Sequence, residues 1–464
     1  MAEGLMARLA ALAADHPGLS GVRLVDDGGE ALALRLRLVA AAQRCIDVQY
    51  YIWKDDASGR ALLAALAAAA ARGVEVRLLL DDHGTAGLDG ALAALDALPG
   101  VEVRLFNAFR WRSPKWLNFL WDFGRLNRRM HNKCLVVDGV AAVIGGRNIG
   151  DEYFVADHPA LTADLDVLGV GAVAAEVDDD FELYWASPAS VPVSVLVGRA
   201  GRVPEVSLPD LDDWWPEADD FDWVPVRMIS DDPAKISGEA APAALWLPQL
   251  QDAMGPIRSR LMLVSAYFVP TDAGVALFER LVADGVAVQI LTNSLRSNDV
   301  AVSHAGYAPV RRRLLAAGVR LWEMKGRAAD RAELGLVPRR LRRGETRTKG
   351  ESTAFFRSGA SALHAKTFVA DGERLFVGSM NFDPRSYLLN TEIGFLIESP
   401  AMARLLEDRL TAMLPAFAWE VKQAPSGRLQ WHGRTAVHDR EPFTRWWQRW
   451  VLTLIGWLPV AWLL

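Results

Sequence analysis

The sequence predicts an α/β protein built from two copies of one domain, related by a pseudo-twofold axis, with one active site where the copies meet. Strand-like runs alternate with helical patterns, the same succession occurs twice, and a His-x-Lys motif recurs at a constant offset. A chain of 464 residues that is 51% hydrophobic has ample length for the cores of two such domains.

Each copy opens with strands that are joined by helices. The β-rich run Ile46–Trp53 is followed by an alanine-rich helix and the short strand Gly73–Leu80, and a further helix leads to Gly100–Phe106. The matching runs of the second copy are Leu261–Val269, Gly285–Leu291 and Gly318–Trp322. Strands that alternate with helices are typical of βαβ units, so we expect a largely parallel core sheet in each copy.

The best match between the copies is a polar motif. His131-Asn132-Lys133 with Asp138 recurs as His364-Ala365-Lys366 with Asp371. Gly145-Gly146 with Asn148 recurs at the same offset as Gly378-Ser379 with Asn381. Both copies therefore keep one ungapped spacing through the motif, which indicates a duplicated domain.

The residue types of the motif are suited to a phosphodiester. Side chains of a strand alternate between its faces, so the histidine and lysine of each triplet project to the same side. One neutral imidazole can attack phosphorus while the other, protonated, donates to the leaving alcohol. Lysine and asparagine side chains can hold the charged oxygens, so neither a metal nor a cofactor is expected. This hypothesis involves His131, Lys133, Asn148, His364, Lys366 and Asn381.

Acidic residues downstream are candidates to orient the imidazoles. Asp166 in DLDV aligns with Glu392 in NTEI, and each is expected to orient the histidine of its own domain, as triad acids do. Asp164 is a rival to Asp166. Ser379 stands where the first copy has Gly146, so a hydroxyl ligand is expected in one half only.

The two motifs resemble the HxKxxxxD signature of the phospholipase D superfamily, and the resemblance extends from residue 46 to the C-terminus. YYIWKDDASGR, RLNRRMHNK, GGRNIGDEYF and DLDV are similar to bacterial cardiolipin synthases of the C type. The resemblance implies two phospholipase D-like α-β-α domains, a phosphatidyl-histidine intermediate and a second lipid alcohol as acceptor. It also implies that Asp138 and Asp371 complete the catalytic motifs. By the superfamily pattern His131 is the nucleophile and His364 the general acid/base, although sequence symmetry leaves these roles open.

Four segments are expected along the chain. Residues 1–188 and 243–425 form the two domains, and residues 189–242, rich in Pro, Asp and Trp, form an irregular connector. Residues 426–464 form a Trp-rich tail, in which Arg445 and Arg449 flank tryptophans, as at a membrane interface. Docking of this tail on the protein's own core is the alternative.

Two further segments are candidates for lipid contact. Phe109–Phe123 holds three Trp and three Phe and either lines a lipid entrance or is ordinary core. The basic run before the second motif either attracts anionic headgroups or is a solvated loop; it comprises Arg339, Arg340, Arg342, Arg343, Arg347 and Lys349.

Composition limits the other functions. A net charge of −6 argues against a general nucleic-acid coat, so a nuclease is the weaker alternative and no nucleic-acid partner is expected. Cys45 and Cys134 are expected to be small buried residues. Residues 1–19 are predicted to form an amphipathic helix and not a signal peptide, and no segment predicts a membrane span. A hydrolase that releases phosphatidic acid remains an alternative to the synthase.

The implied partners are phospholipids (phosphatidylglycerol, phosphatidylethanolamine or cardiolipin) and a membrane surface. The resemblance implies a peripheral location on the cytoplasmic face of the bacterial inner membrane. The need for an accessory protein is left open.

Overall fold

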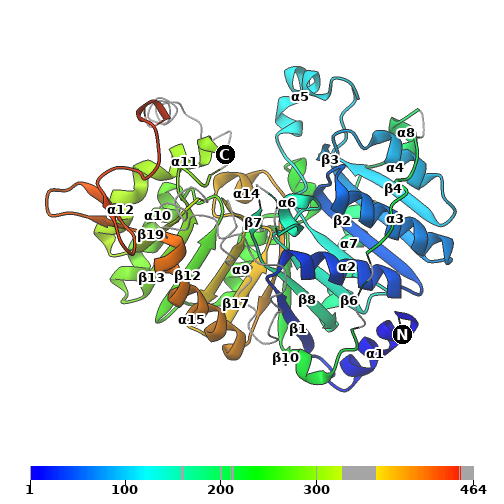
Figure 1. The fold of residues 1–464 in the computed structure, drawn as a ribbon, viewed down its shortest axis with the longest axis horizontal. Helices are drawn as coiled ribbons and strands as arrows, with labels where there is room; N and C mark the ends of the chain where they lie inside the picture. The colour runs from blue at the N-terminus through cyan, green and yellow to red at the C-terminus, as the bar shows by residue number, and fades with distance from the viewer. Residues whose placement is uncertain are drawn as a thin grey trace, which may run out of the picture.

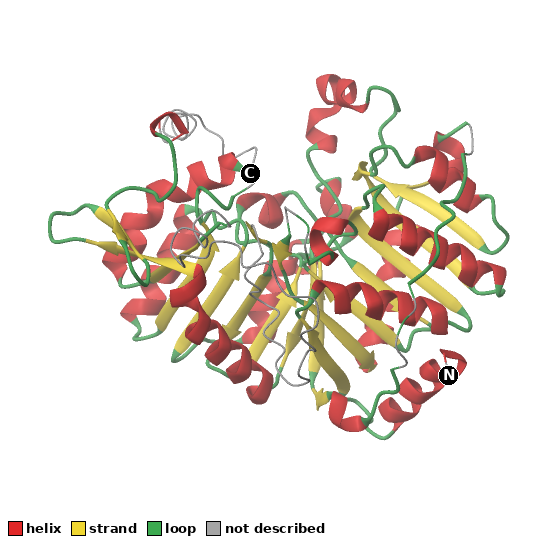
Figure 2. Cartoon of the chain, viewed as in Figure 1, coloured by secondary structure: helices red, strands yellow, loops and turns green. Residues whose placement is uncertain are grey.

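The molecule has two lobes side by side, each built on a large β-sheet (Figure 1). The computed structural model describes residues 2–156, 158, 161–198, 201–209, 211, 214–298, 300–326, 362–448 and 450. The basic run at residues 339–349 and the last fourteen residues of the tail lie outside the described residues. Helices cover both faces of the sheets, which gives the expected α-β-α layers (Figure 2).

The first lobe contains a nine-stranded sheet. Its order is β10 (Asp222–Val224), β1 (Ser20–Val25), β8 (Asp166–Gly171), β6 (Ala141–Gly145), β5 (Cys134–Val137), β2 (Cys45–Ile52), β3 (Glu75–Gly84), β4 (Val101–Phe106) and β9 (Ser190–Pro192). Its helices are α1 (Ala2–Ala14), α2 (Gly28–Ala41), α3 (Ala57–Ala71), α4 (Asp89–Asp96), α5 (Phe119–Leu126), α6 (Asp151–Phe154), α7 (Ala172–Ala186) and α8 (Val193–Leu196).

The second lobe contains a ten-stranded sheet. Its order is β11 (Val226–Ser230), β18 (Ile393–Ile397), β17 (Arg374–Gly378), β16 (Lys366–Ala370), β12 (Arg260–Ser265), β13 (Ala287–Asn293), β14 (Arg320–Met324), β19 (Ala418–Gln423), β20 (Leu429–His432) and β21 (Val437–His438). Its helices are α9 (Trp246–Met254), α10 (Asp272–Ala283), α11 (Ala301–Tyr307), α12 (Arg311–Ala317), α14 (Pro384–Leu388) and α15 (Pro400–Phe417).

The predicted strands and the internal repeat are confirmed, but a largely parallel sheet was wrong. Among the described strands of the two large sheets, only β2–β3–β4 and β12–β13–β14 run parallel, because helices cross between these strands. The hairpins β5–β6 and β16–β17 are antiparallel, since short turns join them. Each sheet is therefore mixed.

The two lobes share a hydrophobic core. Strands β6 and β8 contact β17 and β18, and apolar side chains from both sheets form one buried cluster. The approach is close at Gly169, where a Cβ atom would lie 3.0 Å from the ring of Phe395 in the other lobe. This contact holds the two halves in a defined relation around the site.

The connector is less irregular than predicted. Within residues 189–242, β9 and β10 pair with the first sheet, and β11 pairs with the second. The chain passes directly from β10 in the first sheet to β11 in the second sheet. The connector thus ties the two lobes together.

The remaining sequence expectations concern short segments. Residues 2–14 form helix α1, and the alanine-rich run at residues 61–71 lies in α3, whose inner face is buried. Cys134 is buried and Cys45 is half-buried, and neither forms a disulfide. Across the described part of the chain, no helix has the length and apolar character needed to cross a membrane.

Candidate active site

Two short parallel strand contacts bring the halves of the site together. Met130 bridges Thr391 of the second lobe, and the His131 N–H donates to the Thr391 carbonyl at 3.0 Å. The related contact joins β7 (Thr162–Ala163) to β15 (Ala362–Leu363), and the His364 N–H donates to the Ala163 carbonyl at 2.8 Å. Each histidine backbone is therefore held by the opposite lobe.

The acid that orients each histidine also comes from the opposite lobe. His131 Nδ1 lies 2.8 Å from Glu392 Oε2, and His364 Nδ1 lies 2.6 Å from Asp164 Oδ2. The expectation that each acid serves its own domain was wrong, because the strand contacts between the lobes bring each histidine against the acid of the other lobe. Nδ1–H donation to a carboxylate leaves Nε2 of each ring available for chemistry.

Strand register explains why Asp164, and not Asp166, pairs with His364. Gly145 faces Asp166 across β6 and β8, whereas its counterpart Gly378 faces Gly394 across β17 and β18. Asp166 therefore corresponds to Gly394, and Asp164 corresponds to Glu392. The alignment of Asp166 with Glu392 was wrong by two residues.

Asp166 has a structural role, because it pairs with two buried arginines. Its carboxylate forms buried ion pairs with Arg35 at 2.9 Å and Arg147 at 3.2 Å. Burial without these partners would be costly for a carboxylate. Asp166 therefore joins α2 to the strand that carries the site and does not contact either histidine.

The first lobe has Gly146 where the second has Ser379, because the two acids, Asp164 and Glu392, differ in length. Ser379 Oγ donates to the Glu392 carboxylate and also accepts the Ile393 N–H at 3.0 Å. At the corresponding place in the first lobe, a Cβ on Gly146 would lie 2.1 Å from Asp164 Oδ1. The shorter aspartate occupies the space that a serine side chain would need.

The lysines are buried beside the histidines. Lys133 Nζ donates to the His131 carbonyl at 2.5 Å and lies over the Tyr51 ring, and Lys366 Nζ donates to the His364 carbonyl. Burial lowers the pKa of Lys133 well below its usual value, with Lys366 acting in the same direction. A bound phosphate would supply the negative charge that these ammonium groups require.

The two acids differ in their electrostatics. Burial raises the pKa of Glu392 to about 7, and the Lys133 charge and the Ser379 hydrogen bond offset this only in part. Burial also acts to raise the pKa of Asp164, but His364 and Lys366 outweigh it, and the pKa falls to about 2. Burial lowers the pKa of both histidines, and the pKa of His131 lies well below its usual value.

Comparison with known proteins agrees with this geometry. The family model described as "Cardiolipin synthase, PLD-like domain" matches residues 36–185 and 249–414. Cardiolipin synthase C of Escherichia coli (strain K12) is 44% identical, covering 98% of each chain. The chain belongs to the cardiolipin synthase family of the phospholipase D superfamily. The resemblance and the enzyme class predicted from the sequence are thus confirmed.

A more distant relative and one solved structure are consistent with this placement. Cardiolipin synthase A of Pseudomonas syringae pv. syringae is 29% identical, over 84% of this chain and 68% of that protein. The crystal structure of phosphatidylserine synthase from Haemophilus influenzae Rd KW20 superposes with a TM-score of 0.57 at 13% identity. It covers 89% of this chain and 91% of that chain, which confirms the bilobal fold.

In this cardiolipin synthase family member, Asp138 and Asp371 lie away from the imidazoles. Each follows its strand in a tight turn with positive φ, roughly 20 Å along the strand from its histidine. The Asp138 carboxylate accepts the N–H groups of Gln43, Arg44 and Cys45 at 2.7–3.0 Å. Asp371 likewise accepts those of Arg258, Ser259 and Arg260. Their expected catalytic role is not supported by their position.

The asparagines also support the backbone. Asn148 Oδ1 accepts the Ile52 N–H at 3.2 Å, and its Nδ2 donates to the Tyr153 hydroxyl at 3.1 Å. Asn381 Oδ1 accepts the Tyr267 N–H at 3.3 Å. One N–H of the Asn148 amide is thus engaged by Tyr153, and the expected contact of Asn148 and Asn381 with phosphate oxygens stays a prediction.

Sequence reasoning missed several residues that shape the site. The rings of Tyr51 and Tyr153 lie edge-on to His131 and His364, with centroids 5.0 and 5.2 Å away. Asp231 of the connector accepts the Glu392 N–H at 3.0 Å and pairs with Lys235 at 2.9 Å. Of these residues, only the tyrosines could have been found from the sequence; Tyr153, for example, follows Asn148 within the first motif. Within the described ranges, no three His, Cys, Asp or Glu side chains are grouped to hold a metal ion.

Proposed function

We propose that this chain transfers a phosphatidyl group between phospholipids to form cardiolipin, through a covalent phosphatidyl-histidine. The observation that carries the proposal is the pair of buried histidines, each held through Nδ1 by a carboxylate of the other lobe. Two oriented imidazoles beside two lysines provide a nucleophile, a proton donor and cations for one phosphodiester.

The first half-reaction forms the intermediate. His131 Nε2 attacks the phosphorus of a donor lipid, and the bond from phosphorus to the headgroup alcohol breaks. His364 supplies the proton that the departing alkoxide needs. Lys133 and Lys366 neutralise the charge that collects on the non-bridging oxygens.

The second half-reaction regenerates the enzyme. The glycerol hydroxyl of a phosphatidylglycerol acceptor gives its proton to His364 and attacks phosphorus, and the P–N bond to His131 breaks. Attack by water in place of this alcohol would release phosphatidic acid. The donor is phosphatidylglycerol, phosphatidylethanolamine or cardiolipin, all of which present the same diester.

The difference between the two acids supports His131 as the nucleophile. The His131 pKa lies well below its usual value, so the ring is neutral at neutral pH and can attack. His364 faces Asp164, whose lowered pKa keeps that carboxylate ionised, and the Asp164 charge acts to raise the pKa of His364, which burial lowers. We therefore assign proton transfer to His364, with Asp164 and Glu392 as positioning residues.

Product analysis tests the function. Vesicles of phosphatidylglycerol and phosphatidylethanolamine are incubated with wild type, His131→Ala and His364→Ala, and the lipids are identified by mass spectrometry. Cardiolipin from wild type alone is the expected result. Phosphatidic acid without cardiolipin would replace the proposal with a hydrolase.

A lipid analogue with a nitrophenol leaving group tests the roles of the histidines. Nitrophenolate leaves without a proton, so His364→Ala should still release it and accumulate phosphorylated His131. His131→Ala should release none. The opposite pattern would exchange the two roles.

We also place the protein at a membrane surface, as a peripheral protein on the cytoplasmic face of the bacterial inner membrane. Its lipid substrates and its exposed aromatic side chains support this location. Fractionation of cells into soluble and membrane pools, with and without a carbonate wash, tests it; resistance to the wash would contradict peripheral attachment.

A further inference from the structure

Exposed tryptophans gather in two segments far apart in the sequence. We name residues 111–123 the first projection and residues 443–450 the second projection. Of the seven tryptophans described as exposed, six lie in these projections; they are Trp111, Trp116, Trp121, Trp446, Trp447 and Trp450. Trp116, Trp121 and Trp446 are 63%, 68% and 69% exposed. Large aromatic groups left in water in two clusters mark an interaction surface.

The first projection stands on a rigid ionic base. Arg112 and Lys115 both reach the buried carboxylate of Asp82, and Lys115 Nζ lies 2.8 Å from it. Arg112 also pairs with Asp89, and the Phe109 N–H donates to Asp82 at 2.7 Å. Burial acts to raise the pKa of Asp82, but the two cations outweigh it and lower that pKa.

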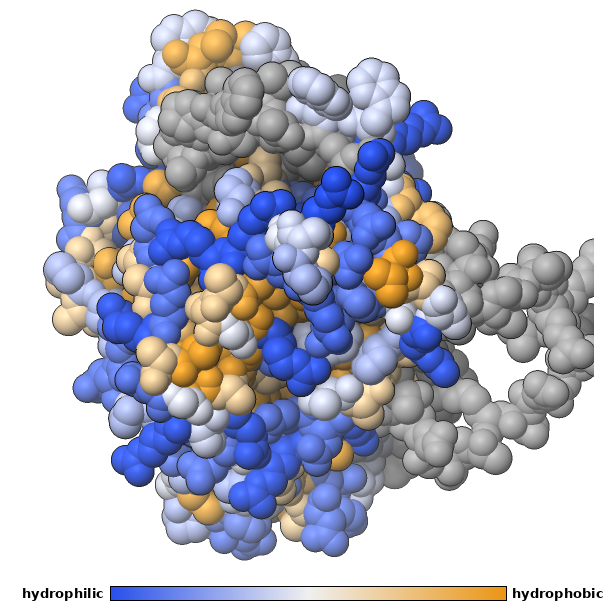
Figure 3. All heavy atoms as spheres, turned by 90° about the vertical axis from the view of Figure 1, so that its left-hand side faces the viewer, coloured by the Kyte–Doolittle hydropathy of each residue, from blue (hydrophilic) through white to orange (hydrophobic). Residues whose placement is uncertain are grey.

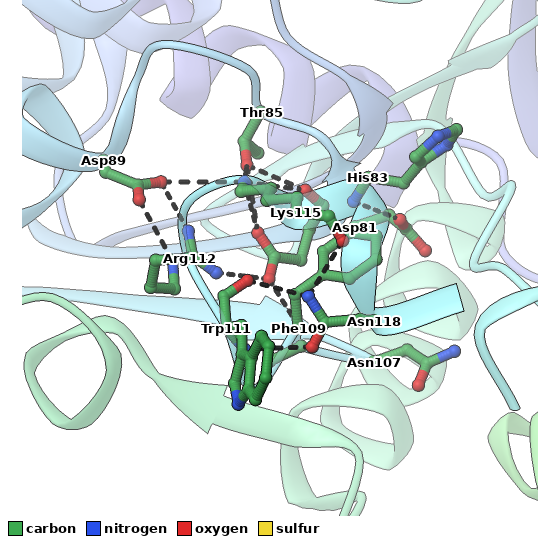
Figure 4. Close-up of polar contacts among 12 residues, drawn as sticks. Asp81, His83, Thr85, Asp89, Asn107, Phe109, Trp111, Arg112, Lys115 and Asn118 are labelled. Atoms are coloured by element: carbon green, nitrogen blue, oxygen red, sulfur yellow. Dashed lines mark hydrogen bonds and ion pairs between the residues drawn. The ribbon is translucent and has the colours of Figure 1, made fainter. Parts of the chain in front are cut away.

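Asn118 closes the same segment upon itself. Its Oδ1 accepts the Trp111 N–H at 2.9 Å, and its Nδ2 donates to the Trp111 carbonyl at 2.8 Å (Figure 4). The base of the projection is therefore ordered while its aromatic tip points to solvent. A structured loop with an exposed apolar tip is not explained by packing against the described residues of this chain.

The second projection has a comparable anchor. The Glu441 carboxylate accepts from Arg311 at 2.6 Å and lies 3.0 Å from His304 Nε2. Arg311 pairs in turn with buried Glu323, at 2.9 Å. This base lies just before the exposed aromatic residues, which begin at Phe443.

Both projections extend to the same side of the molecule. In Figure 1, α5 and the helical turn at residues 446–448 (red) rise above the upper edge, one from each lobe. The β7 strand, which leads into Asp164, lies between the lobes below them (Figure 1). In contrast, the end of the second lobe in Figure 3 is largely hydrophilic, with smaller hydrophobic patches.

We propose that the two projections dock together on a lipid bilayer, so that the side of the molecule from which they rise faces the membrane. This inference rests on the proposed function, because it assumes that the substrates lie in that bilayer. Tryptophan favours the headgroup region of a membrane, and exposed Arg110 and Arg445 beside the clusters suit anionic headgroups. Two anchored contacts, one per lobe, would fix the orientation of the protein and not merely its attachment.

Flotation with vesicles of phosphatidylethanolamine and phosphatidylglycerol tests the surface. The variants are Trp116→Ser/Trp121→Ser for the first projection and Trp446→Ser/Trp447→Ser for the second. Trp215→Ser is the matched control, since Trp215 is 45% exposed but lies outside both projections. We expect each double variant to weaken vesicle affinity about tenfold or more, and the control to bind as wild type.

Activity on a dispersed short-chain phosphatidylglycerol, below its micelle concentration, separates docking from chemistry. Docking variants should keep wild-type rates on this substrate while losing activity on vesicles. Docking would be overturned if both double variants bound vesicles with wild-type affinity. It would also be overturned if the tryptophans proved to be shielded in a dimer that does not bind vesicles. If the proposed function itself is wrong, the wild type will form no lipid product. The comparison of vesicle binding between wild type and variants remains valid in that case.

Discussion

Glu392 and Asp164 occupy equivalent places, yet they hold their histidines under different conditions. Glu392 is longer, receives a hydroxyl hydrogen bond from Ser379, and has its pKa raised by burial to about 7. Asp164 lies against a glycine, and its pKa is about 2 because the charges of His364 and Lys366 outweigh burial. The duplication thus produced a site whose two halves can carry out different steps.

The Glu392 carboxylate predicts an acid limb in the pH profile. Glu392 must be ionised to accept the His131 Nδ1–H, so activity should fall as pH drops through about 7. The Ser379 hydrogen bond stabilises the ionised form, and Ser379→Ala should therefore raise this pKa and move the limb to higher pH. The profile of kcat/KM against pH measures the shift. Ser237→Ala, which removes an exposed hydroxyl, is the control; an unmoved limb in Ser379→Ala would contradict the assignment.

Gly146→Ser is predicted to inactivate the enzyme although the second copy has serine at this place. The new Cβ would lie 2.1 Å from Asp164 Oδ1, so the carboxylate must move away from His364. A displacement of about 1 Å at a positioning group costs on the order of 10²-fold in rate. Steady-state kinetics should show this loss with unchanged circular dichroism. Gly198→Ser, which points into open space, should keep wild-type activity.

At the scale of elements, two equivalent turns fasten the catalytic strands to their neighbours. Asp138 ends β5 and accepts three N–H groups at the start of β2, and Asp371 does the same for β16 and β12. Both residues have positive φ, which aspartate and asparagine tolerate better than alanine. The acidic residue of each motif thus stabilises the strand that presents the histidine.

Asp138→Ala is therefore expected to lower stability more than chemistry. Loss of the carboxylate acceptor and the strained φ should together reduce the free energy of unfolding by about 2–3 kcal/mol. Urea unfolding measures this change, and the folded variant should keep near wild-type kcat. Asp138→Asn should recover much of the stability. Lost activity at full stability would return Asp138 to the chemistry.

At the scale of the whole molecule, the site exists only while the lobes are in register. His131 depends on Thr391 and Glu392, and His364 depends on Ala163 and Asp164. The shared core beneath, and the connector strands β10 and β11, maintain that relation. Stability of the interface and activity should therefore change together.

Gly169→Leu tests this coupling. Its side chain would collide with Val173 and with the Phe395 ring across the interface. Overpacking of this kind costs roughly 1–3 kcal/mol, and separation of the lobes would also misplace both acid–histidine pairs. We expect a lower thermal midpoint and a reduced kcat, measured by calorimetry and product assay. Gly198→Leu should change neither, and normal kinetics in Gly169→Leu would contradict the coupling.

Local sequence patterns predicted the duplication, the core strands of each copy with the helices between them, and the histidine–lysine motifs. These depend on local spacing: alternation places His131 and Lys133 on one face, and the same spacing recurs at His364 and Lys366. The family resemblance rests on the same residues. Long motifs repeated without a gap are strong signals because few other structures satisfy them.

The pairing of each histidine with its acid follows from the packing of the lobes and not from a local sequence pattern. Asp164 and Asp166 are two residues apart and share one face of an extended strand, so no alternation pattern distinguishes them. The register between β6 and β8 selects Asp164, and the meeting of the sheets carries it to His364, 200 residues away. Contacts of this kind depend on how the two sheets pack against each other, which local sequence does not encode.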